Sequence, residues 1–195
     1  MRFSKEEAST VHQALQTITS PCAHLELFTA QNLDEMVELF SSPDFYQGND
    51  MKEAPDKERL DKLMHERLRL LLWRVFSCED ELRGEQVGFI GWNGNAGPAY
   101  ITFFPTSAQF DTDVFRDAAL SIVHAFFSMS DGDTLHIYLS HPIPEEIHDM
   151  VVEAGFDLWQ EYPGVNSEEE STYIMERSTF QAYYLEDDDD EEEAY

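Results

Sequence analysis

The sequence predicts a single domain of the α/β class in its α+β form, a mixed β-sheet flanked by helices, with a disordered acidic C-terminal tail. Strand and helix patterns alternate over residues 73–177, an order typical of a sheet covered by helices. Leu135–Leu139 is nearly continuous in apolar residues, as expected of a central buried strand. Glu186–Glu193 is an unbroken acidic run that cannot pack into a core.

Composition is consistent with one domain of ordinary size. The chain has 195 residues, of which 42% are hydrophobic and 13% aromatic, enough to bury a substantial core. We therefore expect a helical N-terminal extension over residues 1–22, the folded domain over residues 23–180, and the disordered tail over residues 181–195.

The net charge is −28. The acidic run contributes 8 of the 40 acidic residues, so the rest of the chain still has 32 acidic residues against 12 basic ones. Such a protein should repel nucleic acid and anionic membranes and attract basic protein surfaces. A protein that is acidic only for solubility remains the alternative.

Cysteine usage and hydropathy indicate a reducing compartment, the cytoplasm or the nucleus. Cys22 and Cys78 have no metal-ligand spacing, although a single disulfide between them stays open. No stretch approaches the length of a membrane span, and residues 1–20 lack the apolar core of a secretory signal. The seven scattered histidines predict no metal site.

Before residue 73 the sequence predicts three helices, one strand and a long loop. Lys5–Leu15 should be a helix, His24–Thr29 a strand, and Asn32 the cap of a second helix. Pro43–Pro55 has the composition of a loop. Asp56–Leu72 places apolar residues along one stripe, which predicts an amphipathic helix.

After residue 72 the pattern predicts six strands and two helices. The strands are Trp73–Cys78, Gln86–Trp92, Ala99–Phe104, Leu135–Leu139, Phe156–Gln160 and Thr172–Glu176. Asp111 or Asp113 should cap a helix that runs to about Ser128. The other helix, Glu145–Ala154, should stop at Gly155, which suits a helix C-terminus.

The order of these elements resembles the GNAT acetyltransferase fold over residues 73–177. The resemblance rests on the hairpin that ends in Gln86–Ile90, on the strand Ala99–Ile101, and on the helix that ends in Glu153–Phe156. It implies a GNAT-like mixed sheet. If the protein shares the activity of the family's enzymes, the resemblance also implies that it transfers an acetyl group from acetyl-CoA to an amine.

The segment expected to bind the coenzyme departs from the family pattern. GNAT enzymes hold the pyrophosphate in a loop of pattern Q/R-x-x-G-x-G/A, whose glycines let backbone N–H groups approach the phosphates at a helix N-terminus. Here the corresponding residues are Phe110, Asp111, Thr112 and Asp113. Aspartates repel a pyrophosphate, so we expect a degenerate loop and no cofactor.

The residues that the family uses for acid and base catalysis are also missing. Many GNAT enzymes have an asparagine at the start of the second conserved helix and a thiolate-protonating tyrosine near its end. At the corresponding positions this chain has Pro144 and Val151. The strand Ala99–Phe104 has no carboxylate to act as a base. We therefore expect no catalytic residues. If the protein is an enzyme after all, Tyr100 and His136 are the nearest titratable candidates.

The chain also resembles ornithine decarboxylase antizymes, a non-catalytic branch of the same fold. The shared features are Tyr100 and Ile101 followed by Pro105, the segment Gly155–Leu158, and an acidic C-terminus. The resemblance implies a cytoplasmic inhibitor of polyamine synthesis that binds ornithine decarboxylase and directs it to the proteasome. The residues expected to meet the basic partner are Asp111, Asp113, Asp117, Glu145, Glu146 and Asp149.

Two alternatives stay open. One is an acetyl-CoA-dependent N-acetyltransferase with an atypical cofactor loop, acting on a basic amine such as a polyamine or a lysine-rich protein. The other is an inhibitor that mimics DNA, in which carboxylates take the place of phosphates on a nucleic-acid-binding protein.

Overall fold

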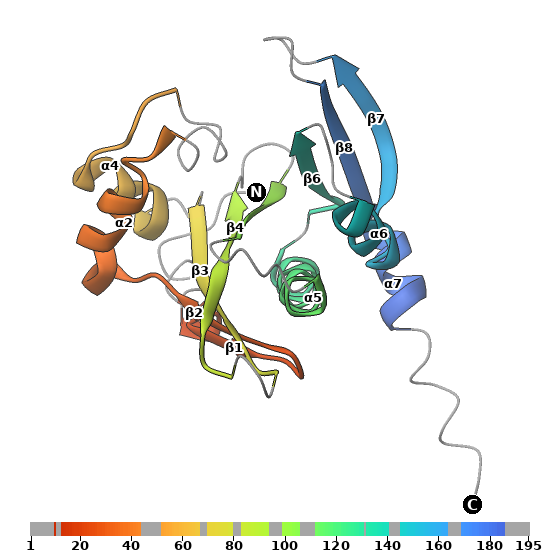
Figure 1. Cartoon of the computed structure of the whole chain (residues 1–195), viewed down its shortest axis with the longest axis horizontal. Coiled ribbons are helices and arrows are strands. Elements are labelled where there is room, and N and C mark those ends of the chain that lie inside the picture. Colours follow the sequence, from red (N-terminus) through yellow and green to blue (C-terminus); the bar gives the residue numbers. More distant parts are fainter. Residues whose placement is uncertain are drawn as a thin grey trace, which may run out of the picture.

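The computed structural model describes residues 10, 13–43, 52–66, 70–79, 83–93, 99–105, 112–130, 132–140, 145–163 and 169–185. They form an eight-stranded sheet in the order β1-β2-β3-β4-β5-β6-β8-β7, flanked by helices (Figure 1). Neighbouring strands are antiparallel except β5 and β6, which are parallel. The predicted fold class, a mixed sheet flanked by helices, is confirmed.

The strands are β1 (Thr17–Thr19), β2 (Ala23–Leu27), β3 (Leu70–Ser77), β4 (Gln86–Asn93), β5 (Ala99–Pro105), β6 (Thr134–Ser140), β7 (Asp157–Pro163) and β8 (Glu169–Glu176). The helical elements are η1 (Ala30–Asn32), α2 (Leu33–Leu39), α4 (Lys57–Asp61), η2 (Lys62–Glu66), α5 (Thr112–Met129), α6 (Glu145–Glu153) and α7 (Arg177–Tyr184).

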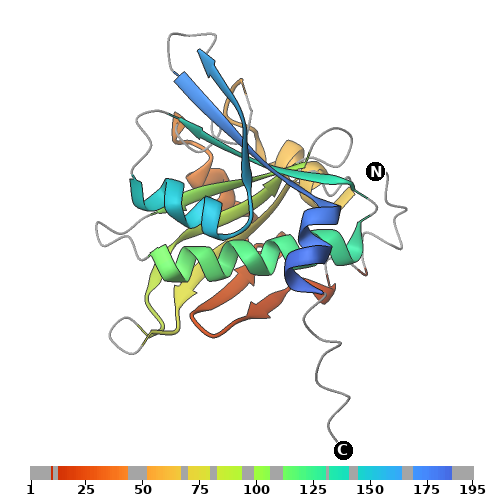
Figure 2. The same cartoon turned by 90° about the vertical axis from the view of Figure 1, so that its right-hand side faces the viewer.

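Each face of the sheet has its own core. Helices α5, α6 and α7 cover one face, and α2 and α4 cover the β3–β4 part of the other (Figures 1 and 2). The first core includes Phe115 and Ile122 of α5, Val151 of α6 and Phe180 of α7, all buried. The second includes Met36 of α2 and Leu60 of α4. Burial of each such side chain contributes roughly 1.5–3 kcal/mol.

Helix α5 is the centre of the first core because its apolar residues recur at helical spacing. The buried positions are Val114, Phe115, Ala118, Ala119, Ile122, Val123, Phe126 and Phe127. This stripe fits the three- and four-residue steps of one helix face. The helix predicted to run to about Ser128 is confirmed, and it starts at Thr112.

An arginine ties α2 to the sheet. Arg74 of β3 forms a two-nitrogen contact with Glu35 of α2 and a further ion pair with Glu26 of β2, 3.8 Å away. Its guanidinium also lies 4.4 Å from the centre of the Phe28 ring. These contacts fix α2 over β2 and β3. Strands β5 and β6 therefore lie beside α2 and not beneath it.

The predicted helix Asp56–Leu72 is wrong in its second half. The α-helix covers only Lys57–Asp61, a π-helical turn follows to Glu66, and β3 begins at Leu70. Leu70, Leu71 and Leu72 pair with Asn93, Trp92 and Gly91 of β4. Their apolar side chains suit either element, and pairing with the neighbouring strand decides for the sheet.

The two ends of the domain also differ from expectation. Thr17–Thr19 forms the edge strand β1, and Leu15 lies in the first core, so part of the predicted N-terminal extension belongs to the sheet. Arg177–Tyr184 forms α7, whose Phe180 is buried, so the predicted disordered tail starts too early at residue 181. Residues 186–195, where the acidic run falls, lie outside the described residues.

The helix stops and the other predicted strands are confirmed. Gly155 follows α6 with φ of +80°, a left-handed conformation that glycine adopts freely. The helix expected after Asn32 is present, but the Asn32 side chain does not cap it. Its Oδ1 instead accepts a hydrogen bond from the backbone N–H of Thr29, at 3.2 Å.

Candidate functional site

Strands β5 and β6 separate soon after they meet, leaving a wedge between them. Only three residue pairs join the strands, Ala99 with Leu135, Tyr100 with His136, and Ile101 with Ile137. Beyond these pairs β5 continues to Pro105, bonded to β4, and β6 continues to Ser140, bonded to β8. Within the described part of the chain, the facing edges of β5 and β6 therefore no longer pair with each other in the wedge.

The two side chains proposed as candidate acid or base meet at the narrow end of the wedge. Ile101 and Ile137 face α5 and are buried in the first core. Tyr100 and His136 precede them, so their side chains lie together on the opposite face of the sheet. The structure thus brings together two residues that are 36 positions apart in the sequence.

An aromatic cluster surrounds this pair. The rings of Tyr100 and Tyr138 meet edge to face at 5.3 Å between centroids, and the His136 ring stacks on Tyr138 at 6.2 Å. His136 is 7% exposed, and this burial lowers the pKa of its imidazole. Near neutral pH the imidazole is therefore uncharged and able to accept a proton.

Thr102 places a hydroxyl at the start of the wedge. It is the first β5 residue beyond the last pair with β6, and it is 9% exposed. Within the described part of the chain, its Oγ1 has no hydrogen-bond partner. A buried hydroxyl without a partner costs on the order of 1–3 kcal/mol, so it marks a place where a ligand atom fits. The sequence gives no signal for this, because threonine is common in strands.

The N-terminal ends of α5 and α6 lie on the same side of the molecule, where β6 ends (Figure 2). Of the degenerate loop, Phe110 and Asp111 lie outside the described residues, whereas Thr112 and Asp113 form the start of α5. Asp113 is therefore not the helix cap. It belongs to the first turn, where its carboxylate also complements the helix dipole.

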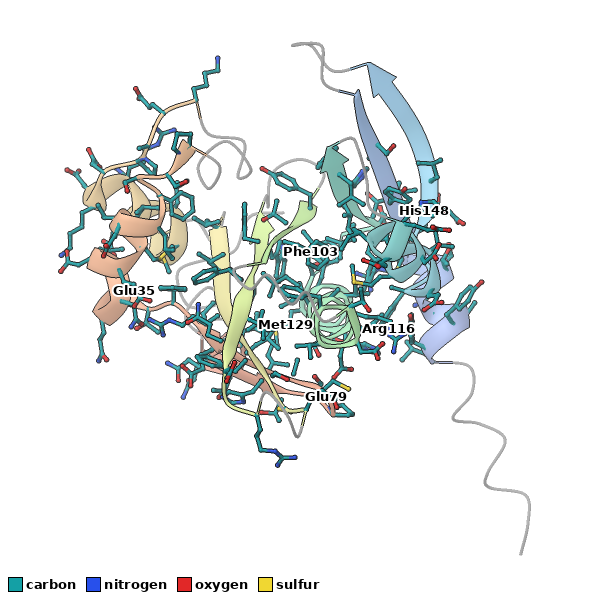
Figure 3. All side chains as sticks on the ribbon, viewed as in Figure 1. Glu35, Glu79, Phe103, Arg116, Met129 and His148 are labelled. Atoms are coloured by element: carbon teal, nitrogen blue, oxygen red, sulfur yellow. The ribbon has the colours of Figure 1, made fainter. Side chains whose placement is uncertain are left out.

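Arg116 partly neutralises this end of α5. Its guanidinium pairs with Asp113 at 2.9 Å and with Glu153 of α6 at 3.2 Å, and its side chain extends from α5 toward α6 (Figure 3). All three side chains are well exposed, so each pair is worth less than about 1 kcal/mol. The arginine therefore remains available to an anion that competes with these carboxylates.

The other residues expected to bind a basic partner have different surroundings. Glu145, Glu146 and Asp149 are exposed on α6. Asp117 is half-buried, and its Oδ2 accepts a hydrogen bond from the backbone N–H of Cys22 at 2.8 Å. Asp117 thus holds the turn between β1 and β2 against α5. Its predicted contact with a partner remains untested, as do those of the other carboxylates.

In the GNAT family a thiolate-protonating tyrosine stands at the position that Val151 occupies here. Val151 is buried in the first core. Three residues earlier on α6, the Nδ1 atom of His148 lies 2.7 Å from the hydroxyl of buried Tyr173 on β8 (Figure 3 labels His148). This hydrogen-bonded pair on the α6 side of the sheet was missed, because the two residues are 25 positions apart.

Cys22 has an unusually basic thiol. A hydrogen bond to Glu79, burial, and the nearby carboxylates of Asp117, Glu79 and Asp113 raise its pKa to about 11. Both cysteines are free thiols. Cys22 lies at the turn before β2, where its backbone oxygen accepts a hydrogen bond from the N–H of Cys78 at 2.8 Å. Glu79, labelled in Figure 3, follows Cys78 just after the end of β3.

We predict that folded protein protects Cys22 from alkylation. With a pKa of about 11, the thiolate fraction at pH 8 is roughly 100-fold below that of an ordinary cysteine. Iodoacetamide at pH 8 should therefore label Cys22 roughly 100-fold more slowly in the folded protein than in 6 M guanidinium, as measured by mass spectrometry of its peptide. Glu79→Gln should speed the reaction in the folded state. Equal rates in folded and unfolded protein would contradict the prediction.

No group of three or more histidine, cysteine, aspartate or glutamate side chains is arranged to hold a metal ion in the part of the chain that the structure describes. Over the same residues, no helix is long and apolar enough to cross a membrane.

The fold is that of the GNAT acetyltransferases. No protein-family model matches the sequence, and no curated protein sequence is similar to it. Solved structures do match. A GNAT-family acetyltransferase from Bacillus anthracis superposes with a TM-score of 0.55 at 14% identity, over 83% of this chain and 99% of that one.

Several of the similar structures contain coenzyme A. A ribosomal L7/L12 α-N-protein acetyltransferase in complex with coenzyme A matches with a TM-score of 0.59 at 11% identity, over 82% of this chain and 97% of that one. An aminoglycoside acetyltransferase in complex with coenzyme A matches with a TM-score of 0.56 at 14% identity, over 83% and 98%. At such identities the likeness shows the fold alone.

Proposed function

We propose that the protein is an acetyl-CoA-dependent N-acetyltransferase that acts on a basic amine. The single observation that carries this proposal is the wedge between β5 and β6, where the facing edges of the two strands do not pair with each other over the described residues. Coenzyme A in two structures of the same fold supports a thioester donor. The proposal reverses our sequence-based preference for a non-catalytic protein, which no comparison supports.

The thioester arm of coenzyme A fits the wedge. That arm is extended and contains two amide groups, which can bond to open strand edges as a further strand would. The hydroxyl of Thr102 adds a buried donor and acceptor at the point where the wedge starts. Our expectation that the protein uses no cofactor rested on the loop alone, and the wedge favours a coenzyme.

The phosphate end of the coenzyme would meet carboxylates at the N-terminal ends of α5 and α6, and these would repel it. Asp113, Glu145 and Glu146 are acidic residues in the first turns of α5 and α6. Each carboxylate about 4 Å from a phosphate charge costs about 4 kcal/mol at an effective dielectric constant near 20, and less where salt and solvent screen it. Arg116 is the only lysine or arginine in these two helices and is the residue that would offset this repulsion.

Within this proposal, His136 and Tyr100 act on the acceptor. When bound, the coenzyme supplies an acyl group activated as a thioester. Only the neutral amine attacks such a group, so the acceptor's ammonium must first lose a proton. The uncharged His136 imidazole is the group at the narrow end of the wedge that can take it. Tyr100 lies opposite His136 and would orient the amine.

Calorimetry with acetyl-CoA tests the proposal. We expect binding at micromolar to submillimolar concentration, followed by formation of acetylated product when spermidine or a lysine-containing peptide is added, detected by mass spectrometry. His136→Gln should keep coenzyme binding and lower the turnover by on the order of 100-fold. No binding at millimolar acetyl-CoA would overturn the proposal.

We predict opposite effects of Thr102→Val on stability and on coenzyme binding. Valine has nearly the same shape and removes the buried hydroxyl, so the free energy of unfolding of the free protein should rise by about 1 kcal/mol. Affinity for acetyl-CoA should fall about fivefold, because a ligand hydrogen bond is lost. Denaturant unfolding and calorimetry measure the two effects. Thr102→Ser is the matched control and should retain binding. Unchanged affinity in the valine variant would exclude Thr102 from the coenzyme site.

A second candidate is the non-catalytic binding of a basic partner, as in antizymes. The observation in its favour is the exposed acidic surface of α6, with Glu145, Glu146 and Asp149. Mixing the protein with purified ornithine decarboxylase and following activity and dimer mass tests this candidate. Inhibition that is lost when all three carboxylates are replaced by amides would support it. Unchanged activity and mass at excess protein would exclude it.

A further inference from the structure

Tyr138 is a solvent-exposed aromatic residue on β6, which is an inner strand of the sheet. Strand β6 lies between β5 and β8, and side chains on one of its faces are buried under α5 and α6. On the other face Tyr138 remains 41% exposed. Helices α2 and α4 pack over Phe28, Leu72 and Phe89, so they cover the β3–β4 part of this face, and Tyr138 lies beyond them.

The exposed ring lies beside the proposed reaction site. Tyr138 follows Ile137, the last β6 residue paired with β5, and its side chain is on the same face as those of His136 and Tyr100. The edge-to-face contact with Tyr100 holds the Tyr138 ring in one orientation. Together the two tyrosines form an aromatic wall next to the imidazole.

Such a wall suits a cation. The face of an aromatic ring carries partial negative charge and attracts ammonium groups, by about 0.5–1 kcal/mol at exposed sites and about 2 kcal/mol when water is excluded. The neighbouring His136 is uncharged near neutral pH and so does not repel an incoming cation. The protein's net charge of −28 concentrates cations at its surface.

We propose that Tyr100 and Tyr138 form the acceptor site and hold an alkylammonium group by cation–π contact beside the wedge. This inference rests on the proposed function, because it names the substrate class of the same site. A primary ammonium on a flexible alkyl chain is common to free polyamines and to lysine side chains of proteins. The rings recognise the ammonium and its methylene groups, and neighbouring carboxylates are not required.

Direct acceptor binding without the donor tests the inference. Calorimetry in 150 mM salt, which screens non-specific attraction to the acidic surface, would use spermidine and Nα-acetyl-lysine methylamide as probes. We expect Tyr138→Leu to weaken binding of the favoured probe at least fivefold, and Tyr138→Phe to stay within twofold of the wild type. Tighter binding of spermidine indicates a free polyamine, and tighter binding of the lysine probe indicates a protein acceptor.

A matched control comes from the chain itself. Tyr183 of α7 is another exposed tyrosine, 65% exposed, and Tyr183→Leu should leave the affinity unchanged. Melting temperatures of all variants should agree with the wild type, since both rings lie partly in solvent. Equal affinity of Tyr138→Leu and wild type overturns the inference. Equal weakening by leucine and phenylalanine also overturns it, because the hydroxyl rather than the ring would then hold the amine.

Failure of this inference is separable from failure of the proposed function. If acetyl-CoA binds and acetylated product forms while Tyr138→Leu retains full affinity for the amine, the acetyltransferase proposal stands and the aromatic acceptor site falls. If acetyl-CoA does not bind at millimolar concentration, the acetyltransferase proposal falls, and with it the assignment of Tyr100 and Tyr138 to an acceptor.

Discussion

Arg177→Ala should lower the free energy of unfolding by about 3 kcal/mol, a fall in melting temperature on the order of 10 °C for a domain of this size. Arg177 begins α7, and its guanidinium reaches the last turn of α5. It donates to the backbone oxygens of Phe127 at 2.7 Å, Ser130 at 2.6 Å and Gly132 at 2.9 Å. It also lies 5.0 Å from the centre of the Phe127 ring.

The effect is large because alanine leaves several acceptors without a partner at once. The last carbonyls of a helix have no intrahelical donor, and Arg177 supplies one from a distant part of the chain. Arg177→Lys should lower the free energy of unfolding by about half as much as Arg177→Ala. A lysine ammonium cannot reach all three oxygens that the planar guanidinium contacts. Denaturant unfolding measures both changes.

Lys57→Ala serves as the control for loss of a cation. Lys57 pairs with Asp34 at 2.5 Å, but both side chains are largely exposed, so the loss should stay below about 1 kcal/mol. A loss at Arg177→Ala no greater than that at Lys57→Ala would show that the helix end does not depend on the guanidinium.

Gly88→Ala should lower the free energy of unfolding by about 2–3 kcal/mol. A Cβ atom on Gly88 of β4 would lie 2.5 Å from Cζ of Phe115 and 2.6 Å from the backbone oxygen of Phe104. The Phe115 ring can turn aside at some cost in packing. The carbonyl oxygen belongs to β5 and cannot move without disturbing the β4–β5 ladder next to the wedge.

Gly84→Ala is the matched control at a second glycine. Gly84 lies in the β3–β4 hairpin with φ of +82°, and no atom lies within 4 Å of an added Cβ. Gly84→Ala should therefore lower the free energy of unfolding only through the strain of a side chain at positive φ, by about 1 kcal/mol. Urea unfolding should give a greater loss for Gly88→Ala. Equal losses would mean that β4 and β5 move apart easily, and the wedge would then be less rigid than the structure indicates.

The contrast between α5 and β3 shows how far local pattern determines this fold. The apolar stripe of α5 has a helical period over eighteen residues, and the sequence predicts its end correctly. Leu70–Leu72 has no period of its own, so it was assigned to the preceding helix. Only pairing with Gly91–Asn93 places it in the sheet, and that pairing joins segments about twenty residues apart.

The candidate site shows the same division more sharply. Tyr100 and His136 were candidates because they are titratable residues in neighbouring predicted strands. Their juxtaposition depends on the parallel register of β5 and β6. Thr102 and Tyr138 were not candidates at all, because a threonine or a tyrosine in a strand is ordinary until its burial is known.

The sequence by itself determined the order of the elements from β4 to β8 and the acidity, because hydrophobic period, helix-stopping glycine and charge are local properties of the chain. Only the tertiary structure decided where β5 and β6 part, which hydroxyl is buried there without a partner, and which tyrosine stays exposed. Those features depend on register and packing between segments far apart in the chain, and no local pattern records them.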